Sequence, residues 1–169
     1  AAGLWLPETL DEPLRRGAEA HTERLALVDR ERRLSYGELW EQIELAAGML
    51  TARGVGRGDV VSFQLPNWAE AAIVHHAVAL LGAVSNPIIP IYRGHELGFI
   101  LRQAGSRVLV VPDVFRRFDY REMAAGLLAE CEALEHVLVV GEPGAGMESF
   151  AAAIEAAEPA AAPPQRDPG

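Results

Sequence analysis

The chain has 169 residues, 50% of them hydrophobic, with a formal net charge of -9 at pH 7 and a pI near 5.0. This length predicts one domain with a sizeable core, and the hydrophobic content excludes a disordered protein. The acidic balance argues against nucleic acid or an anionic membrane as a partner, because both require clustered Lys and Arg.

Along the chain, the first predicted elements are a helix over 10–24 and two short strands at 25–29 and 32–36. The strands are separated by Arg30 and Glu31, so they predict a hairpin, although the turn lacks the Gly or Asn that hairpins favour.

The next helix has clear signals at both ends. Ser35 and Glu38 have the spacing of a capping box, and Gly54 is a natural C-terminal cap. Between them one stripe of apolar residues predicts the buried face. This stripe comprises Leu39, Ile43, Ala46, Ala47 and Leu50.

The stretch 58–92 predicts strand, buried helix, strand. Val61, Phe63 and Leu65 alternate with other residues as in a strand, and Asn67 with Glu70 predicts a capped helix start. No charged residue follows from 71 to 92, so this helix must be covered on nearly every side. A strand, a helix and a strand form a βαβ unit, whose strands are parallel.

Helices and strands continue to alternate to the end of the apolar sequence. The expected elements are a helix at 97–104 closed by Gly105, a strand at 107–112, a helix at 120–134, a strand at 136–140 and a short helix at 147–157. This alternation predicts an α/β fold, a layered parallel sheet with helices on both faces. Residues 1–157 form the predicted α/β subdomain, and 158–169 an Ala/Pro-rich linker or tail.

Two glycine-rich stretches have the appearance of phosphate loops without the required chemistry. Residues 141–146 have the P-loop spacing, but Met147 and Glu148 stand where Lys and Ser or Thr would bind phosphate and magnesium. Gly54, Gly56 and Gly58 lie after a helix and before a strand, the reverse of a dinucleotide motif. Both stretches are interpreted as turns.

The side chains most often used in catalysis also favour structural interpretations. His75 and His76 are adjacent on a helix and point about 100° apart, so they cannot share a metal as an i, i+4 pair can. One of them lining a pocket stays an alternative to a hydrogen-bonded core position. Cys131 is expected to be a small buried hydrophobe. No residue is predicted to be catalytic or to bind a metal, and the cofactor-binding residues are unknown.

A resemblance to a known family emerges from several short motifs taken together. They are LSYGEL at 34–39, LPN at 65–67, GAV at 82–84, NP at 86–87, YR at 92–93 and EL at 96–97. In order and spacing they resemble the N-terminal subdomain of adenylate-forming acyl-CoA synthetases, from about Thr9 to Gly141. Within that family the chain looks most like ligases for medium-chain and alicyclic acids, such as cyclohexanecarboxylate-CoA ligase.

The resemblance implies formation of an acyl-adenylate from an acid and ATP, followed by transfer of the acyl group to coenzyme A. ATP, Mg²⁺ and coenzyme A would serve the full-length ligase, whereas none is expected in these residues. The family's phosphate loop, Thr-Glu motif and catalytic Lys are missing, so the chain is interpreted as an inactive N-terminal fragment. Its role is expected to be structural, and the resemblance leaves open which residues border the acyl or coenzyme A channel.

The partners and the alternative function follow from the same interpretation. The remainder of the ligase chain is the first expected partner. Loss of that partner would expose apolar side chains in 86–92, including Ile88, Ile89 and Ile91, and favour a dimer of the fragment. The alternative is a self-contained, non-catalytic α/β binding or interaction module.

The single Cys131 cannot form an internal disulfide, so a reducing cytoplasm is the expected compartment. No signal peptide is expected, because the first residues of this sequence show no basic region before an apolar run. No membrane span is expected, because the longest uncharged stretch contains Gly82, Pro87 and Pro90, whereas a span requires roughly 20 mostly apolar residues in one helix.

Overall fold

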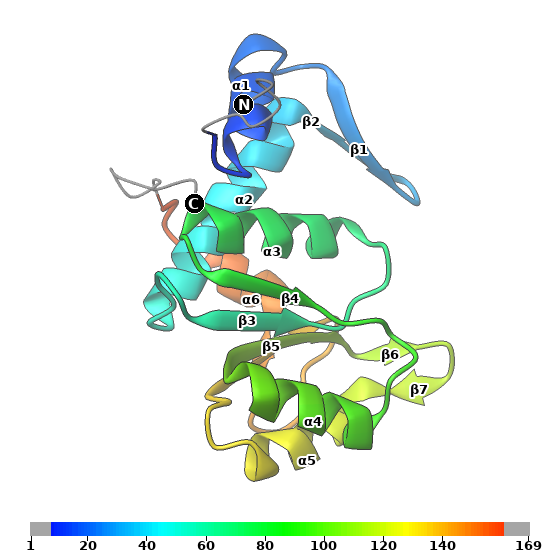
Figure 1. Cartoon of the computed structure of the whole chain (residues 1–169). Coiled ribbons are helices and arrows are strands. Elements are labelled where there is room, and N and C mark those ends of the chain that lie inside the picture. The colour runs from blue at the N-terminus through cyan, green and yellow to red at the C-terminus, as the bar shows by residue number, and fades with distance from the viewer. Residues whose placement is uncertain (1–7, 161–169) are drawn as a thin grey trace, which may run out of the picture.

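The computed structural model describes residues 8–160 and contains a five-stranded sheet with helices on both faces (Figure 1). Every neighbouring pair of strands in this sheet is parallel, as the sequence predicts. The strand order is β4-β3-β5-β8-β9. The strands are β3 (Val60–Phe63), β4 (Val84–Pro87), β5 (Ser106–Pro112), β8 (His136–Val140) and β9 (Glu148–Ser149).

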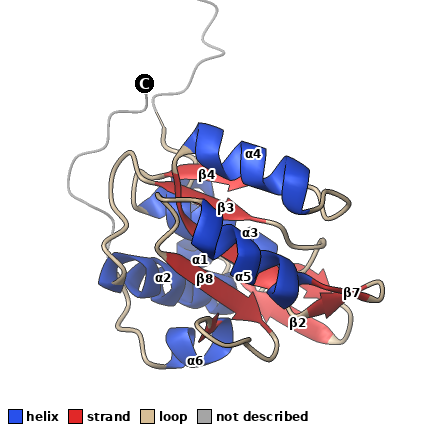
Figure 2. Ribbon diagram, turned by 90° about the horizontal axis from the view of Figure 1, so that it is seen from below, coloured by secondary structure: helices blue, strands red, loops and turns tan. Residues whose placement is uncertain are grey.

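Two helical layers cover the sheet. The helices α2 (Tyr36–Ala52), α3 (Ala69–Leu80) and α6 (Phe150–Glu155) pack on one face. The other face carries α4 (Gly94–Ala104) and α5 (Tyr120–Glu130), which lie in front of the strands in Figure 2.

Each face of the sheet has its own core. Along β5, Val108 and Val110 belong to the core under α2 and α3, whereas Leu109 and Val111 belong to the core under α4 and α5. Side chains on a strand alternate between faces, so a strand covered on both faces is apolar throughout. The predicted α/β class with helices on both faces is confirmed.

The N-terminal elements lie outside the five-stranded sheet. The helix α1 (Glu12–Ala20) and the antiparallel hairpin of β1 (Leu25–Asp29) and β2 (Arg32–Ser35) lie on the α2 and α3 side (Figure 1). The hairpin is confirmed, and its turn places Arg30 at a φ of 54°, in the left-handed region. A second small hairpin, β6 (Val114–Phe115) with β7 (Phe118–Asp119), follows β5.

The start of α2 matches its sequence signals. Ser35 Oγ accepts a hydrogen bond from Glu38 N at 3.2 Å, and the Glu38 carboxylate accepts one from Ser35 N at 2.8 Å. All members of the predicted stripe, Leu39, Ile43, Ala46, Ala47 and Leu50, are buried. Gly54 has a φ of 74° just beyond the helix, as expected of a C-terminal cap.

The segment after α6 packs on α2 at a glycine. A Cβ on Gly48 would overlap the carbonyl oxygen of Glu158. Ala160 N donates to Glu44 O at 3.0 Å. Residues 158–160 are therefore seated against α2, in a groove that only glycine leaves open.

Several element boundaries differ from their predictions. The helix expected at 10–24 spans only Glu12–Ala20, and the one expected at 120–134 ends at Glu130. A turn over 131–134 replaces the last helical residues, because β8 begins at His136 and the chain must reverse. The last helix is Phe150–Glu155, since 148–149 pair with β8 as β9.

The sheet has one point where the strand order reverses. From β3 the chain passes through α3 to β4 on one side, and then through α4 to β5 on the other side of β3. The helices of these two connections lie on opposite faces of the sheet. No helix within 8–160 has the length and apolar character to cross a membrane.

Candidate functional site

Ligands of open parallel sheets bind outside the carboxyl ends of the strands, where the strand order reverses. Here the reversal lies between β3 and β5, which are followed by Gln64 and Asp113. We therefore place the candidate site at the carboxyl edge of the sheet.

A pocket of about 610 Å³ lies at this edge. Its volume is within the range of small-molecule sites, ~300–1,000 Å³. The side chains around it combine an indole ring with guanidinium and carboxylate groups. The lining consists of hairpin residues 29–32 with Trp68, Glu70, Asp113, Val140 and Gly141.

The hairpin caps the helix that forms one wall of the pocket. Ala69 N donates to Asp29 Oδ2 at 2.9 Å, so α3 is capped by a residue 40 positions away in the sequence. The predicted cap by Asn67 and Glu70 is wrong, because α3 begins after Trp68, which makes no side-chain cap hydrogen bond. The Asp29 carboxylate replaces it and satisfies a free N–H at the positive end of the helix dipole.

Two further contacts hold the hairpin tip over the pocket. Arg32 Nη1 forms an ion pair with Glu70 Oε1 at 2.8 Å, which uses the carboxylate expected in the cap. The guanidinium of Arg30 lies 4.8 Å from the centre of the Trp68 ring, within the range of a cation–π attraction. The hairpin and the start of α3 therefore form one connected wall.

The opposite wall of the pocket is a carboxylate at the end of β5. The Asp113 oxygens accept hydrogen bonds from Val114 N and Glu142 N. Gly141 has a φ of 115°, and a Cβ there would overlap the Asp113 carboxylate. The glycine thus lets β8 approach Asp113, which fits the interpretation of 141–146 as a turn.

The charges around the pocket disfavour a phosphate. Carboxylates outnumber guanidinium groups in the lining, and one of the arginines, Arg32, is already paired. Within 8–160, no cluster of three or more His, Cys, Asp or Glu side chains is arranged to hold a metal ion. The pocket therefore suits a hydrogen-bond-donating group packed beside Trp68 better than an anion.

The two histidines of α3 lie away from this pocket. His75 Nδ1 is 2.8 Å from Ser85 Oγ, as expected of a hydrogen-bonded structural residue. Burial lowers the pKa of His76, and its Nδ1 has no hydrogen-bond partner within the described residues. Neither histidine lines the Trp68 pocket. Cys131 is buried, as predicted.

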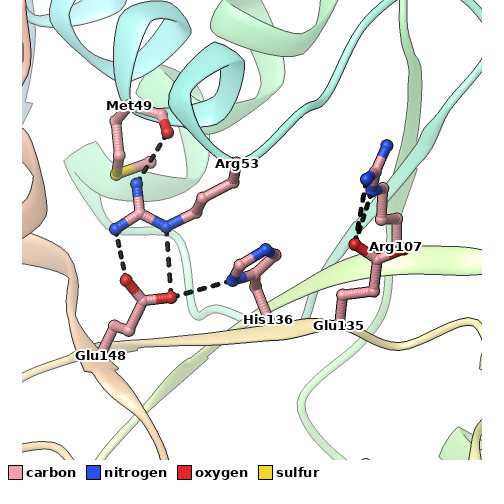
Figure 3. A network of polar contacts seen from close by, with 6 residues as sticks. All are labelled: Met49, Arg53, Arg107, Glu135, His136 and Glu148. Atoms are coloured by element: carbon pink, nitrogen blue, oxygen red, sulfur yellow. Dashed lines mark hydrogen bonds and ion pairs between the residues drawn. The ribbon is translucent and has the colours of Figure 1, made fainter.

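The amino edge of the sheet carries a separate polar network (Figure 3). Arg53, just after α2, donates to both carboxylate oxygens of Glu148, and His136 Nδ1 lies 3.1 Å from Glu148 Oε1. The hydrogen bonds from Arg53 are the main cause that lowers the pKa of Glu148. Nearby, Arg107 donates to Glu135. These contacts tie α2 to β8 and β9, at the edge opposite the candidate site.

At the carboxyl edge, the loop after β4 is held from beneath by two buried side chains. Gln64 Nε2 donates to Ile89 O at 3.0 Å and to Tyr92 O at 3.1 Å. Tyr120 donates its hydroxyl proton to Pro90 O at 2.8 Å. Gln64 and Tyr120 are almost fully buried, so the loop backbone is fixed by residues of two other elements.

The outward side of this loop is apolar. Ile89, Ile91 and Tyr92, called the loop patch below, have 51%, 68% and 37% of their surface exposed. Ile88 is only 6% exposed, so its expected place on this surface is wrong. It packs instead in the core under α4, because its N–H still donates to Phe63 O as a continuation of β4.

Gln64, Trp68, Asp29 and Asp113 were not predicted as site residues. Only the position of Asp113, directly after the strand predicted at 107–112, gave a usable signal, because Gln64 was expected inside a strand that ran on to Leu65. Asp29 and Trp68 gave none, because they reach the site through a contact between distant segments.

Comparison with known proteins gives one consistent family. Residues 14–168 match the family described as AMP-binding enzyme. The salicyl-AMP ligase / salicyl-S-ArCP synthetase of Mycobacterium tuberculosis is 38% identical over 100% of this chain and 31% of its own length. The 2-hydroxy-7-methoxy-5-methyl-1-naphthoate–CoA ligase of Streptomyces carzinostaticus is 37% identical over 83% of this chain and 25% of its own. The medium-chain fatty-acid–CoA ligase of Escherichia coli is 30% identical over 82% of this chain and 25% of its own length.

Solved structures agree with the family match. The apo structure of MbtA from Mycobacterium smegmatis has a TM-score of 0.87 and 32% identity, and the match covers 99% of this chain and 31% of that one. The N-terminal domain of FACL13 from Mycobacterium tuberculosis, 22% identical with a TM-score of 0.77, supports the fold alone. The chain thus spans about a third or less of the length of the named curated relatives.

Proposed function

This chain belongs to the AMP-binding enzyme family, and on that premise we propose that it is the N-terminal structural part of an ATP-dependent acid–CoA ligase. The observation that carries the proposal is the family match over residues 14–168. The TM-score of 0.87, to a structure of which the chain covers 31%, supports it.

The proposed reaction of the whole ligase has two steps. The substrate carboxylate displaces pyrophosphate from ATP and forms an acyl-adenylate, and the thiol of coenzyme A then displaces AMP to give a thioester. Mg²⁺ and cationic side chains would neutralise the phosphate charge. The 169 residues include no lysine, so under this proposal the catalytic lysine belongs to sequence outside them.

We propose a ring-bearing carboxylic acid as the substrate class. The names of the two relatives with 38% and 37% identity specify salicylate and a substituted naphthoate. The medium-chain fatty-acid ligase has the lower identity of 30%. This substrate class includes the alicyclic acids suggested by the sequence motifs.

The proposed role of the described residues is to form one wall of a larger active site. The carboxyl edge of the sheet is the side that we propose faces the rest of the ligase, because ligands of parallel sheets bind there. The acidic lining of the Trp68 pocket disfavours anions, so we propose that ATP and the phosphates of coenzyme A bind elsewhere on the ligase and that this pocket borders an uncharged part of the acyl channel. The partners proposed are the remainder of the ligase and, for the separate chain, a second copy.

The alternative function is a self-contained binding module, favoured by the pocket at the hairpin. The reading frame beyond Gly169 separates the two proposals. A continued frame with a Ser/Thr/Gly-rich loop ending in Lys supports the ligase, whereas an immediate stop codon supports the module. A cytoplasmic location is proposed for either, since the single cysteine is a free, buried thiol.

Activity of the purified chain provides the biochemical test. The 169-residue chain should catalyse no acid-dependent exchange of pyrophosphate into ATP, because it lacks the lysine and the phosphate loop that the proposed reaction requires. Exchange that persists after removal of contaminating ligases would contradict the proposal that the groups required for adenylation lie outside these residues.

A further inference from the structure

The loop patch of Ile89, Ile91 and Tyr92 is rigid as well as apolar. Gln64 and Tyr120 fix the backbone beneath it, as described above, and Pro87 and Pro90 flank its first residues. The Gln64 amide keeps both N–H groups on this loop, although its Oε1 has no donor within the described residues. A surface that is already ordered loses little entropy on association, so these side chains are well suited to a contact.

Charge distinguishes the loop patch from the rest of the molecule. No Asp, Glu, Lys or Arg occurs from 71 to 92, whereas the whole chain has a net charge of -9. The guanidinium of Arg93 is folded back, 4.0 Å from the centre of the Phe118 ring, and donates to Pro90 O and Tyr92 O. Two copies of this acidic chain repel one another over most of their surfaces, but not where one loop patch meets the other. This pattern fits a second copy better than a strongly charged partner.

Two copies of a chain can also pair by joining the exposed edges of their sheets, but the edge next to the loop patch does not allow this. The strand β4 is an edge of the sheet, and its inward hydrogen bonds include those from Val84 N to Asp59 O, just before β3, and from Ile88 N to Phe63 O in β3. N–H groups alternate in direction along a strand, so Ser85 and Pro87 occupy the outward positions. Pro87 has no N–H, which leaves one outward donor in β4 and blocks the addition of a strand.

We infer that the separate 169-residue chain pairs with a second copy of itself through the loop patch, in a two-fold contact of side chains rather than an extended sheet. A two-fold contact brings the same patch of both copies together and closes the assembly at a dimer. The inference specifies the surface for the self-association proposed above, and it does not depend on the ligase reaction.

Sedimentation equilibrium at micromolar concentration tests the pairing. The wild-type chain should show a dimer, and Ile91→Asp should raise its dissociation constant at least about tenfold, because it places two like charges in an apolar contact. Val114→Asp is the matched control, since Val114 is also an exposed apolar side chain, at 47%, but belongs to β6. It should leave the dimer unchanged.

Salt adds a second readout of the same contact. Raising the NaCl concentration from about 0.05 M to about 0.5 M should strengthen the dimer, because salt screens the repulsion between two acidic copies. A dimer that salt weakens depends on ion pairs and overturns the inference. So does a wild type that is monomeric, or a dimer that Val114→Asp disrupts and Ile91→Asp does not. A monomer would leave the loop patch to another part of a ligase, and the pyrophosphate-exchange result would be unaffected.

Discussion

At the scale of single residues, Phe63 illustrates how the sheet is stabilised. Its side chain at the end of β3 is 5% exposed and belongs to the core under α2 and α3. The other residues predicted to be buried with it, Val61, Ile73 and Leu80, are at most 1% exposed. The apolar stretch around β3 is thus the centre of the core that the sequence pattern predicted.

Phe63→Ala should therefore lower the free energy of unfolding by about 3–5 kcal/mol, the usual cost of removing a core aromatic ring. Phe99→Ala is the control, because Phe99 is 60% exposed on α4. It should change the stability by less than about 0.5 kcal/mol. Urea denaturation measures both, and a Phe63→Ala loss below about 1 kcal/mol would contradict the described packing.

At the scale of elements, the cap of α3 shows where sequence signals stop being sufficient. Asn67 and Glu70 have the spacing of a local capping box, yet the donor at Ala69 is satisfied by Asp29 from the hairpin. Local spacing cannot reveal a cap supplied 40 residues away, because that contact depends on how the hairpin packs. The cap of α2 was predictable because both its partners lie within the motif at 35–38.

Two alanine substitutions distinguish the observed cap of α3 by Asp29 from the predicted cap by Asn67. Asp29→Ala should cost about 1 kcal/mol, because it leaves a helix N–H without its acceptor. Asn67→Ala, the control at the position that sequence favours, should cost clearly less. Chemical denaturation of both variants measures the two losses in free energy of unfolding. A larger loss for Asn67→Ala would show that the local capping box, and not Asp29, caps the helix.

The network at the amino edge should make part of the stability depend on pH. Arg53 lowers the pKa of Glu148 below its ordinary value of 4.5, so the folded state favours the charged carboxylate. A lowered pKa contributes stability that is present above about pH 4.5 and is lost as the pH falls through the lower, folded-state value. His136 also contacts this carboxylate, so the side chains that contact the titrating Glu148 are Arg53 and His136.

Glu148→Gln should therefore reduce stability near pH 7 by at most about 1 kcal/mol, since the pair is partly exposed. The difference from wild type should shrink as the pH falls well below 4.5. Glu132→Gln, at an exposed position, serves as the control and should show no such trend. Urea midpoints of wild type and Glu148→Gln, measured across this pH range, test the prediction. A stability difference between them that grows on acidification would contradict the stabilising role of Arg53.

At the scale of the whole molecule, the sequence was sufficient for the layered architecture but not for the site. Long apolar runs such as 107–112 and 136–140 predicted central strands, because burial on both faces leaves no polar positions. The two-residue strands β6, β7 and β9 carry no periodic pattern, and they were missed. The pocket could not be predicted, because its walls come from the hairpin, α3 and the ends of β5 and β8.

The central claim is that these residues are the structural N-terminal part of an adenylate-forming ligase. A chimera provides the most direct test: this chain replaces the aligned residues of the Mycobacterium tuberculosis salicyl-AMP ligase, to which it is 38% identical. The same chimera with Phe63→Ala tests dependence on the core, and thermal unfolding verifies that each protein is folded. Our account predicts salicylate-dependent exchange of pyrophosphate into ATP by the chimera, and less by its Phe63→Ala variant. A chimera that is fully folded yet shows no exchange would contradict the claim.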